Sequence, residues 1–109
     1  MGAFPDAADK LRGTGLDRVL TVQAEHKPIL GICLGMQLLF DRSFEYGEHA
    51  GLGLIPGDVV GMAGVVPAGY KIPHIGWNAL HFPAGRPKRR LVPHVEAGQC
   101  VYFVHSYYA

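Results

Sequence analysis

The segment 28–44 constrains the fold more than any other part of the chain. Residues 28–32 are a short apolar run without polar alternation, which is typical of a strand buried on both faces of a parallel sheet. Residues 34–44 predict a helix. Because this helix would be apolar on nearly every face, we expect it to be buried. Gln37 is the one polar residue in the first half of this helix, so we expect it to have a specific role.

The predicted strand and helix are joined by the sequence Gly-Ile-Cys-Leu-Gly at positions 31–35. A strand-to-helix turn this tight strains the backbone of its central residue and needs small residues two positions before and after it, which Gly31 and Gly35 provide. Cys33 would then lie at the helix N-terminus, where unpaired N–H groups and the helix dipole favour a thiolate. The N–H of Leu34 would contribute to an oxyanion hole, and Gln37 would face the same side one turn later.

A buried cysteine without chemistry is the simpler alternative, because most free cysteines are small core residues. A single Gly-x-Cys-x-Gly string is weak evidence by itself. The apolar strand before it, the helix after it and the buried Gln37 together favour a nucleophile at Cys33.

The rest of the chain predicts an α/β domain with a mainly parallel central sheet. Helix and strand signals alternate in the first half, and β-branched and aromatic residues are dense near the C-terminus. Pro56-Gly57 predicts a turn. We expect helices at about 5–11 and 16–27, extended segments at 52–55, 59–60, 71–82 and 99–108, and a solvated basic loop at 86–90.

Composition and charge restrict the class of protein. The 109 residues suffice for one domain, and 49% hydrophobic with 17% charged residues support a packed core. A formal net charge of +1 gives no long-range field toward nucleic acid or an anionic membrane, and the longest apolar run is shorter than the roughly 20 residues of a membrane span. The chain begins with no basic leader or apolar secretory core, so we expect a cytoplasmic protein.

No pattern of a metal site or a disulfide framework is present in the sequence. Cys33 and Cys100 are too few for a disulfide scaffold, and we treat them as separate thiols. Five of the six histidines show none of the close pairings typical of metal ligands; these are His26, His49, His74, His81 and His94. We expect no metal and no other cofactor.

Three motifs in the same order resemble a known family. KPILGICLGMQLLF at 27–40 resembles the nucleophile segment of class I (triad-type) glutamine amidotransferases. IPHIGWN at 72–78 and YFVHSYY at 102–108 resemble, within that family, the glutaminase subunits of imidazole glycerol phosphate synthases, and residues 2–17 resemble the helix after their first oxyanion loop. The resemblance covers essentially all of residues 1–109 and implies the three-layer, flavodoxin-like α/β fold of class I amidotransferases.

The resemblance also implies a reaction and a set of site residues. Cys33 would attack the side-chain amide of glutamine, form a glutamyl thioester and release ammonia. Gly2 and Leu34 would donate to the oxyanion hole. Five further positions match residues that contact the bound glutamine: Gln37, Glu45, His105, Ser106 and Tyr107.

A partner protein is implied as well. Trp77 and Tyr102 match residues near the interface with the cyclase subunit, a β/α barrel that receives the ammonia through a tunnel for histidine biosynthesis. Without the resemblance, Trp77 would be interpreted as a core aromatic residue and Glu45 as a solvated residue near a helix end. His105 would be interpreted as a strand residue satisfied by a neighbouring backbone group.

The departures from the family pattern concern both ends of the chain. The Pro-Gly-x part of the oxyanion loop is absent, because Met1 directly precedes Gly2. The family's base and its orienting acceptor come from a His-x-Glu motif further toward the C-terminus, whereas this chain stops at Ala109. We therefore expect an internal fragment, truncated at both ends, that lacks the catalytic His-x-Glu and is close to inactive alone.

Two alternatives stay open on the sequence. Another triad amidotransferase, of the anthranilate, purine or pyridoxal pathways, would share the Cys33 turn and Gln37, although the PHIGWN and FVHSYY segments favour the first assignment. A non-catalytic remnant that keeps only the partner-binding surface around Trp77 would not react with a glutamine analogue at Cys33.

Overall fold

The computed structural model describes residues 2–85 and 92–109. The basic loop expected at 86–90 therefore lies outside the described residues. The elements in chain order are α1 (Phe4–Thr14), α2 (Leu16–Ala24), α3 (Leu34–Leu38), β1 (Phe40–Ser43), β2 (His49–Ala50), β3 (Ile55–Gly61), a 3-10 turn (Met62–Gly64), β4 (His74–Ala79), β5 (Cys100–His105) and β6 (Tyr107–Tyr108).

The two N-terminal helices are separated only by Gly15. This glycine has a left-handed backbone (φ 74°), and its N–H donates to the Arg12 carbonyl at 3.1 Å, which closes the end of α1. At the other end of α1, the Phe4 N–H donates to the Glu45 carboxylate at 2.8 Å. The helices predicted at 5–11 and 16–27 are confirmed, with ends at Thr14 and Ala24.

The strands form a four-stranded sheet of order β2-β1-β3-β6 and a separate β4-β5 pair. β1 and β3 are parallel, whereas the pairs β1–β2, β3–β6 and β4–β5 are antiparallel. The α/β class is confirmed, but the described sheet is mixed and not mainly parallel. One reason is connection length: the short link 44–48 between β1 and β2 reverses the chain direction, and parallel neighbours need a longer crossover.

The buried strand expected at 28–32 is a wrong prediction. These residues have no regular secondary structure, and Leu30 and Ile32 are 66% and 76% exposed. An apolar run becomes a strand only where a neighbouring strand satisfies its backbone N–H and C=O groups. Among the described residues, the segment pairs with no strand.

The helix predicted at 34–44 is shorter than expected. α3 ends at Leu38, and the chain continues as β1 from Phe40. The carbonyl oxygens of residues 38–40 accept N–H groups from residues 52–55 at 2.8 to 3.1 Å. This long-range pairing ends the helix, and local apolar periodicity carries no information about it.

The remaining strand predictions hold with changes at their ends. The turn predicted at Pro56-Gly57 is absent, because both residues lie inside β3. They lie where the register between β3 and β1 shifts, so the two residues interrupt the regular pairing without ending the strand. The segment 59–60 is part of β3, and 71–82 contains β4. The C-terminal segment 99–108 is extended but is divided at Ser106 into β5 and β6.

The buried core lies between α1, α3 and the four-stranded sheet. Phe4, Ala8 and Leu38 form one packed cluster, with Phe4 fully buried. Leu39 and Val59 are also buried, on the sheet side. The core thus adjoins both the start of α1 and the end of α3, which places the Cys33 turn on its rim.

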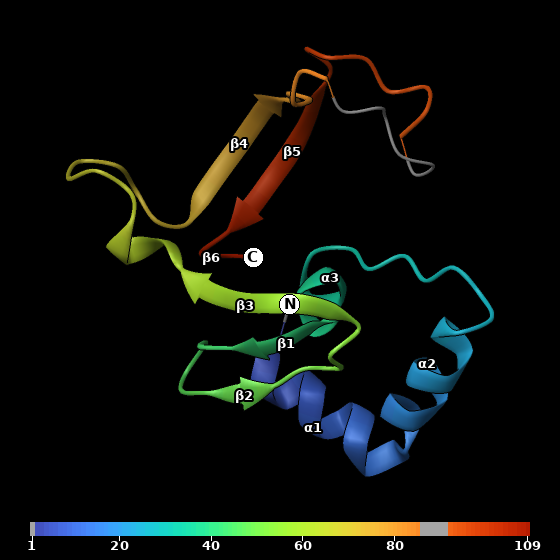
Figure 1. Ribbon diagram of the computed structural model, residues 1–109. Coiled ribbons are helices and arrows are strands. Elements are labelled where there is room, and N and C mark those ends of the chain that lie inside the picture. The colour runs from blue at the N-terminus through green and yellow to red at the C-terminus, as the bar shows by residue number, and fades with distance from the viewer. Residues whose placement is uncertain (1, 86–91) are drawn as a thin grey trace.

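The molecule has an open shape. Figure 1 shows the β4–β5 hairpin extending from one side of the four-stranded sheet, while α1 lies at the opposite side, next to β2, with α2 beside α1. The Cα radius of gyration is 15.5 Å, compared with about 13 Å for a compact domain of this length. Apolar side chains of α2 such as Val19 and Val22 are more than half exposed.

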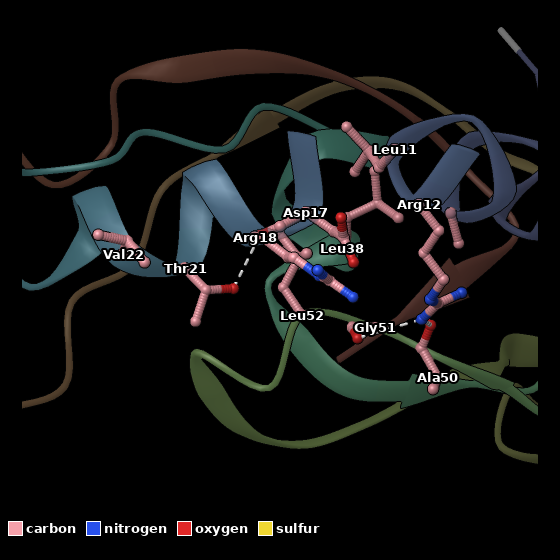
Figure 2. A pocket seen from close by; sticks show the side chains of 11 residues that line it. Leu11, Arg12, Asp17, Arg18, Thr21, Val22, Leu38, Ala50, Gly51 and Leu52 are labelled. Atoms are coloured by element: carbon pink, nitrogen blue, oxygen red, sulfur yellow. Dashed lines mark hydrogen bonds between the residues drawn. The ribbon is translucent and has the colours of Figure 1, made fainter. Parts of the chain in front are cut away.

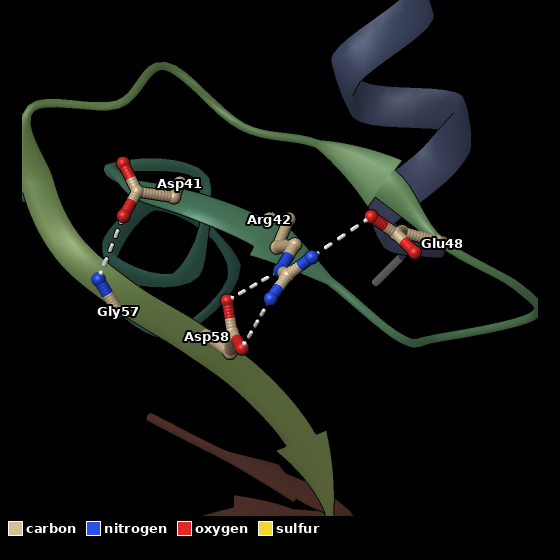
Figure 3. Close-up of polar contacts among 5 residues, drawn as sticks. All are labelled: Asp41, Arg42, Glu48, Gly57 and Asp58. Atoms are coloured by element: carbon tan, nitrogen blue, oxygen red, sulfur yellow. Dashed lines mark hydrogen bonds and ion pairs between the residues drawn. The ribbon is translucent and has the colours of Figure 1, made fainter.

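An ion-pair cluster joins the parallel strands (Figure 3). Arg42 of β1 donates through Nε and Nη2 to both carboxylate oxygens of Asp58 of β3, at 2.7 and 3.1 Å. Its Nη1 donates to Glu48 at 3.1 Å. The hydrogen bonds from Arg42 lower the pKa of Asp58 below its ordinary value and raise the pKa of Arg42.

We expect this cluster to give the fold an acid-sensitive component. Because the pKa of Asp58 is lower in the folded chain, its contribution is present above its ordinary pKa and is lost as the pH falls through the lowered value. Urea unfolding between about pH 3 and 6 should therefore show a smaller fall in stability for Asp58→Asn than for the unchanged chain. The exposed Asp9→Asn variant serves as the control and should retain the full pH dependence.

Candidate active site

Cys33 lies at the turn that leads into α3. It is the N-cap residue of the helix, and its backbone has φ 51° and ψ −113°, a region that residues other than glycine rarely occupy. The Gln37 N–H donates to the Cys33 carbonyl at 3.1 Å, which starts the helix directly at this residue. The strained strand-to-helix turn expected from the sequence is therefore present, although the segment before it is not a strand.

Gly31 is required for this turn, and Gly35 is not. A Cβ at position 31 would lie 2.6 Å from the Met36 Cα and 2.7 Å from the Gly35 oxygen, inside the contact distance of real atoms. A Cβ at position 35 would meet nothing within 4 Å. The expectation that both glycines avoid a collision is thus correct for Gly31 and wrong for Gly35, because the short α3 leaves the side of Gly35 open.

A cleft of about 460 Å³ opens beside Cys33. Its wall comes from the N-terminal segment, α3, the loop after β1 and the β5–β6 corner, which are far apart in the sequence. It brings together all eight residues predicted for catalysis, oxyanion binding and glutamine binding: Gly2, Cys33, Leu34, Gln37, Glu45, His105, Ser106 and Tyr107. Tyr46, Pro73 and Val104 complete the wall.

The three additional wall residues were not predicted from the sequence. Tyr46 has a positive φ of 55° and directly precedes Gly47. The glycine indicates a turn after Glu45, and this was the feature of the sequence from which the position of Tyr46 could have been predicted. Pro73 and Val104 belong to the IPHIGWN and YFVHSYY motifs, where they directly precede His74 and His105. Only the folding of β4 against β5 places them together.

Gln37 is buried within this site, with 8% of its surface exposed. It lines the cleft and also a neighbouring cavity of about 450 Å³ that Cys33 borders as well. No buried side-chain nitrogen or oxygen lacks a partner among the described residues, so the polar groups near the cleft are satisfied or reach solvent. The position of Gln37 supports the expectation that its amide faces the cleft.

Glu45 links the cleft to α1. Its Oε2 accepts the Phe4 N–H at 2.8 Å, so the carboxylate satisfies one of the free N–H groups at the start of the helix. Its own N–H donates to the hydroxyl of Ser43, which is fully buried. Because Gly2 lies two residues before Phe4, this contact holds the N-terminal segment against the cleft.

The thiol of Cys33 makes no side-chain hydrogen bond within the described part of the chain. Cys100 is exposed on the far hairpin, and both cysteines are free. A His-x-Glu string does occur at positions 94–96. His94 and Glu96 are exposed in the loop before β5, and neither is among the residues that line the cleft.

The residues expected at a partner interface lie on the hairpin. Trp77 and Tyr102 face each other across β4 and β5, with ring centroids 5.5 Å apart, and they are 71% and 54% exposed. Ile75 and Val104 form the next pair on the same face and are also exposed. Tyr102 borders the cavity of about 450 Å³ next to Cys33, so this apolar face reaches the site.

A further cavity, of about 400 Å³, lies between α1, α2 and the segment 50–52 (Figure 2). Arg12 donates to the Ala50 carbonyl across it. None of the residues predicted for the site lines this cavity, so it is separate from the Cys33 cleft.

The described residues contain no cluster of three or more His, Cys, Asp or Glu side chains able to hold a metal ion. Within the same residues, no helix combines the length and the apolar character needed to cross a membrane.

Comparison with known proteins assigns the family. Residues 7–109 match the family described as "Glutamine amidotransferase class-I". The chain belongs to this family. The resemblance inferred from the Cys33, PHIGWN and FVHSYY motifs is thus confirmed, and so is the α/β fold class.

Curated relatives of this amidotransferase chain share one name, "Imidazole glycerol phosphate synthase subunit HisH". The protein from Aquifex aeolicus is 47% identical over 108 residues, covering 98% of this chain and 49% of the relative. The protein from Geobacillus thermodenitrificans is 52% identical over 111 residues, covering 99% of this chain and 50% of the relative. The chain therefore spans about half the length of the curated relatives it matches.

The two glycines of the Cys33 turn allow a matched test. Gly31→Ala forces backbone atoms apart and should destabilise the chain by about 1–3 kcal/mol, whereas Gly35→Ala should change stability by about 1 kcal/mol or less, in the stabilising direction. Denaturant unfolding measures both. Equal losses for the two variants would contradict the close approach at Gly31.

Proposed function

We propose that this chain carries the nucleophile and most of the glutamine site of a glutamine amidotransferase subunit of imidazole glycerol phosphate synthase. The observation that carries the proposal is the cleft at Cys33, where eight residues expected from the family pattern converge from four separate segments. The similarity to HisH proteins at about 50% identity supports the assignment of the substrate class.

The proposed chemistry begins at the Cys33 sulfur. The thiolate attacks the amide carbon of glutamine, a glutamyl thioester forms, and the C–N bond breaks as the nitrogen takes a proton and leaves as ammonia. The developing oxyanion lies within reach of backbone N–H groups at Leu34 and in the segment of Gly2. A water molecule then hydrolyses the thioester to glutamate.

The other wall residues would hold the amino-acid end of glutamine. His105, Ser106 and Tyr107 form one side of the cleft, and Gln37 and Glu45 line it as well. Carboxylate and amide side chains are suited to the ammonium group of the substrate, and backbone N–H groups to its carboxylate. We propose binding roles for these residues, and none of them as the base.

A thiol with an ordinary pKa of about 8.5 is only a few per cent ionised at neutral pH, so turnover needs a base. The family resemblance implies that the base comes from a His-x-Glu motif, and among the described residues His94 and Glu96 do not line the cleft. We therefore expect residues 1–109 alone to react at Cys33 with an electrophile but to hydrolyse glutamine slowly.

The other triad amidotransferases are the alternative within the same family, because they would share the Cys33 turn. The relatives named HisH support the first assignment.

Ammonia would pass to a cyclase subunit of β/α-barrel form, with the exposed face of the β4–β5 hairpin as the contact. Binding to the synthase of another pathway, and not to this cyclase, would reverse the choice.

The nucleophile is tested by labelling with a chloroketone or diazoketone analogue of glutamine. We expect one label per chain, located at Cys33 by peptide mass spectrometry. L-Glutamine should protect Cys33 from the label, and D-glutamate should not. Cys33→Ser should abolish labelling, and Cys100→Ser and His94→Ala should leave it unchanged. A chain that iodoacetamide labels at both thiols but the analogue does not label would be a non-catalytic remnant.

The partner surface is tested through the single tryptophan. Addition of the imidazole glycerol phosphate cyclase subunit should shift the fluorescence of Trp77, because binding removes the exposed indole from water. Tyr102→Ala should weaken binding by about tenfold or more, as expected for an aromatic residue at an interface centre. Tyr70→Ala, at a residue that is also exposed but lies outside the hairpin, should bind as the unchanged chain does. Equal affinities would contradict the assigned surface.

A further inference from the structure

Two histidines from opposite strands meet at the wall of the Cys33 cleft. His74 and His105 are cross-strand partners in the register of β4 and β5. The Nδ1 atom of His74 lies 3.1 Å from the Nε2 atom of His105, in a partly buried contact. The remaining ring nitrogens also have partners: His74 Nε2 lies 2.9 Å from Asn78 Oδ1, and His105 Nδ1 lies 2.9 Å from the Tyr107 carbonyl oxygen.

The Tyr107 carbonyl fixes the direction of the hydrogen bonds. A carbonyl oxygen only accepts, so His105 must carry a proton on Nδ1. In the neutral ring, Nε2 of His105 is then an acceptor, and His74 must donate to it from Nδ1. Asn78 satisfies the last nitrogen of His74 in either protonation state, because a half-turn of its amide exchanges an acceptor for a donor.

The orientation of the His74 ring is also determined by packing. Its ring stacks on Phe103, with centroids 5.5 Å apart at 30°, and meets the His105 ring edge-on at 5.2 Å. A stacked ring with both nitrogens engaged has few alternative rotamers. His74 therefore presents Nδ1 to His105 in one orientation.

The bond from His105 to Tyr107 spans a corner of the chain. Ser106 lies between β5, which pairs with β4, and β6, which pairs with β3. The Ser106 carbonyl accepts the Met62 N–H at 2.9 Å, and Tyr107 lies opposite Gly61. The backbone at this corner lines the cleft, so the ring of His105 helps to set the shape of the cleft wall.

We propose that His74 and Asn78 are positioning residues of this cleft. Together with the Tyr107 carbonyl they hold His105 in the Nδ1–H tautomer and in one ring orientation, and His105 in turn fixes the corner 105–107 against which a ligand binds. The effect on glutamine binding rests on the proposed function, whereas the tautomer of His105 does not. His74 and Asn78 line neither the cleft nor the neighbouring cavity, so their action passes through His105.

The first test reads the tautomer in the 109-residue chain. Long-range ¹H–¹⁵N spectra of the histidine rings should show His105 protonated at Nδ1. His74→Phe keeps the ring that stacks on Phe103 but removes the donor, and it should shift His105 toward the Nε2–H form. His74→Asn places an amide N–H near the former Nδ1 position and should restore the original tautomer.

The second test reads ligand binding. Glutamine protects Cys33 from the electrophilic analogue, and His74→Phe should raise the concentration needed for half-protection about tenfold, or about 1.4 kcal/mol. The rate of Cys33 alkylation by iodoacetamide should stay unchanged, because this small reagent does not use the corner 105–107 and the turn at Cys33 is not altered. Asn78→Leu should act in the same direction with a smaller effect, and His26→Phe, at an exposed residue after α2, is the matched control.

The outcomes are separable. An Nε2–H tautomer of His105 in the unchanged chain overturns the inference, as does a tautomer unaffected by both His74→Phe and Asn78→Leu. If His74→Phe does not fold, Asn78→Leu and His74→Asn decide in its place. If glutamine fails to protect the unchanged chain, the proposed function fails, while the spectra still decide whether His74 and Asn78 position His105.

Discussion

The close approach of the backbone at Gly31 to the first turn of α3 is the constraint on which the site depends. A Cβ atom at position 31 would lie only 2.6 Å from the Met36 Cα. Only glycine, which has no Cβ, therefore allows this approach. That passage turns the chain sharply enough to hold Cys33 at a positive φ, at the start of a helix and at the edge of a cleft. Leu38, at the other end of α3, packs against Phe4 and Ala8 and so anchors the helix that follows Cys33 in the core.

Two contacts bring distant segments to this turn. Glu45 accepts the first N–H of α1 and so brings the N-terminal segment beside α3. At Ser106 the chain leaves the β4–β5 hairpin and joins the four-stranded sheet through β6, which brings the hairpin to the same place. The cleft exists where these two long-range connections meet, and neither involves the thiol itself. The histidine pair at the hairpin end belongs to the second connection, which is why residues outside the cleft can act on its shape.

The sequence predicted the α/β class, both N-terminal helices and the β-rich C-terminal segment, because these depend on local periodicity and composition. It failed where long-range pairing decides. Residues 28–32 have the composition of a buried strand but no strand partner in the described chain, and residues 40–43 continue as β1 because residues 52–55 bond to the carbonyls at the end of α3. For the same reason the sheet is mixed, since strand direction follows from connections and not from the residues of each strand.

The sequence by itself determined which residue types are available to the site: a cysteine between glycines, a glutamine one turn later and the motifs that carry the family resemblance. Those are properties of residue type and local spacing, and they can be recognised without knowledge of long-range contacts. The tertiary structure alone decided that Gly31 and not Gly35 is sterically required, that Glu45 also holds α1, and that His74 contacts His105. Each of these depends on atoms that are many residues apart, and their distances are fixed only when the two sheets and α1 are assembled around the Cys33 turn.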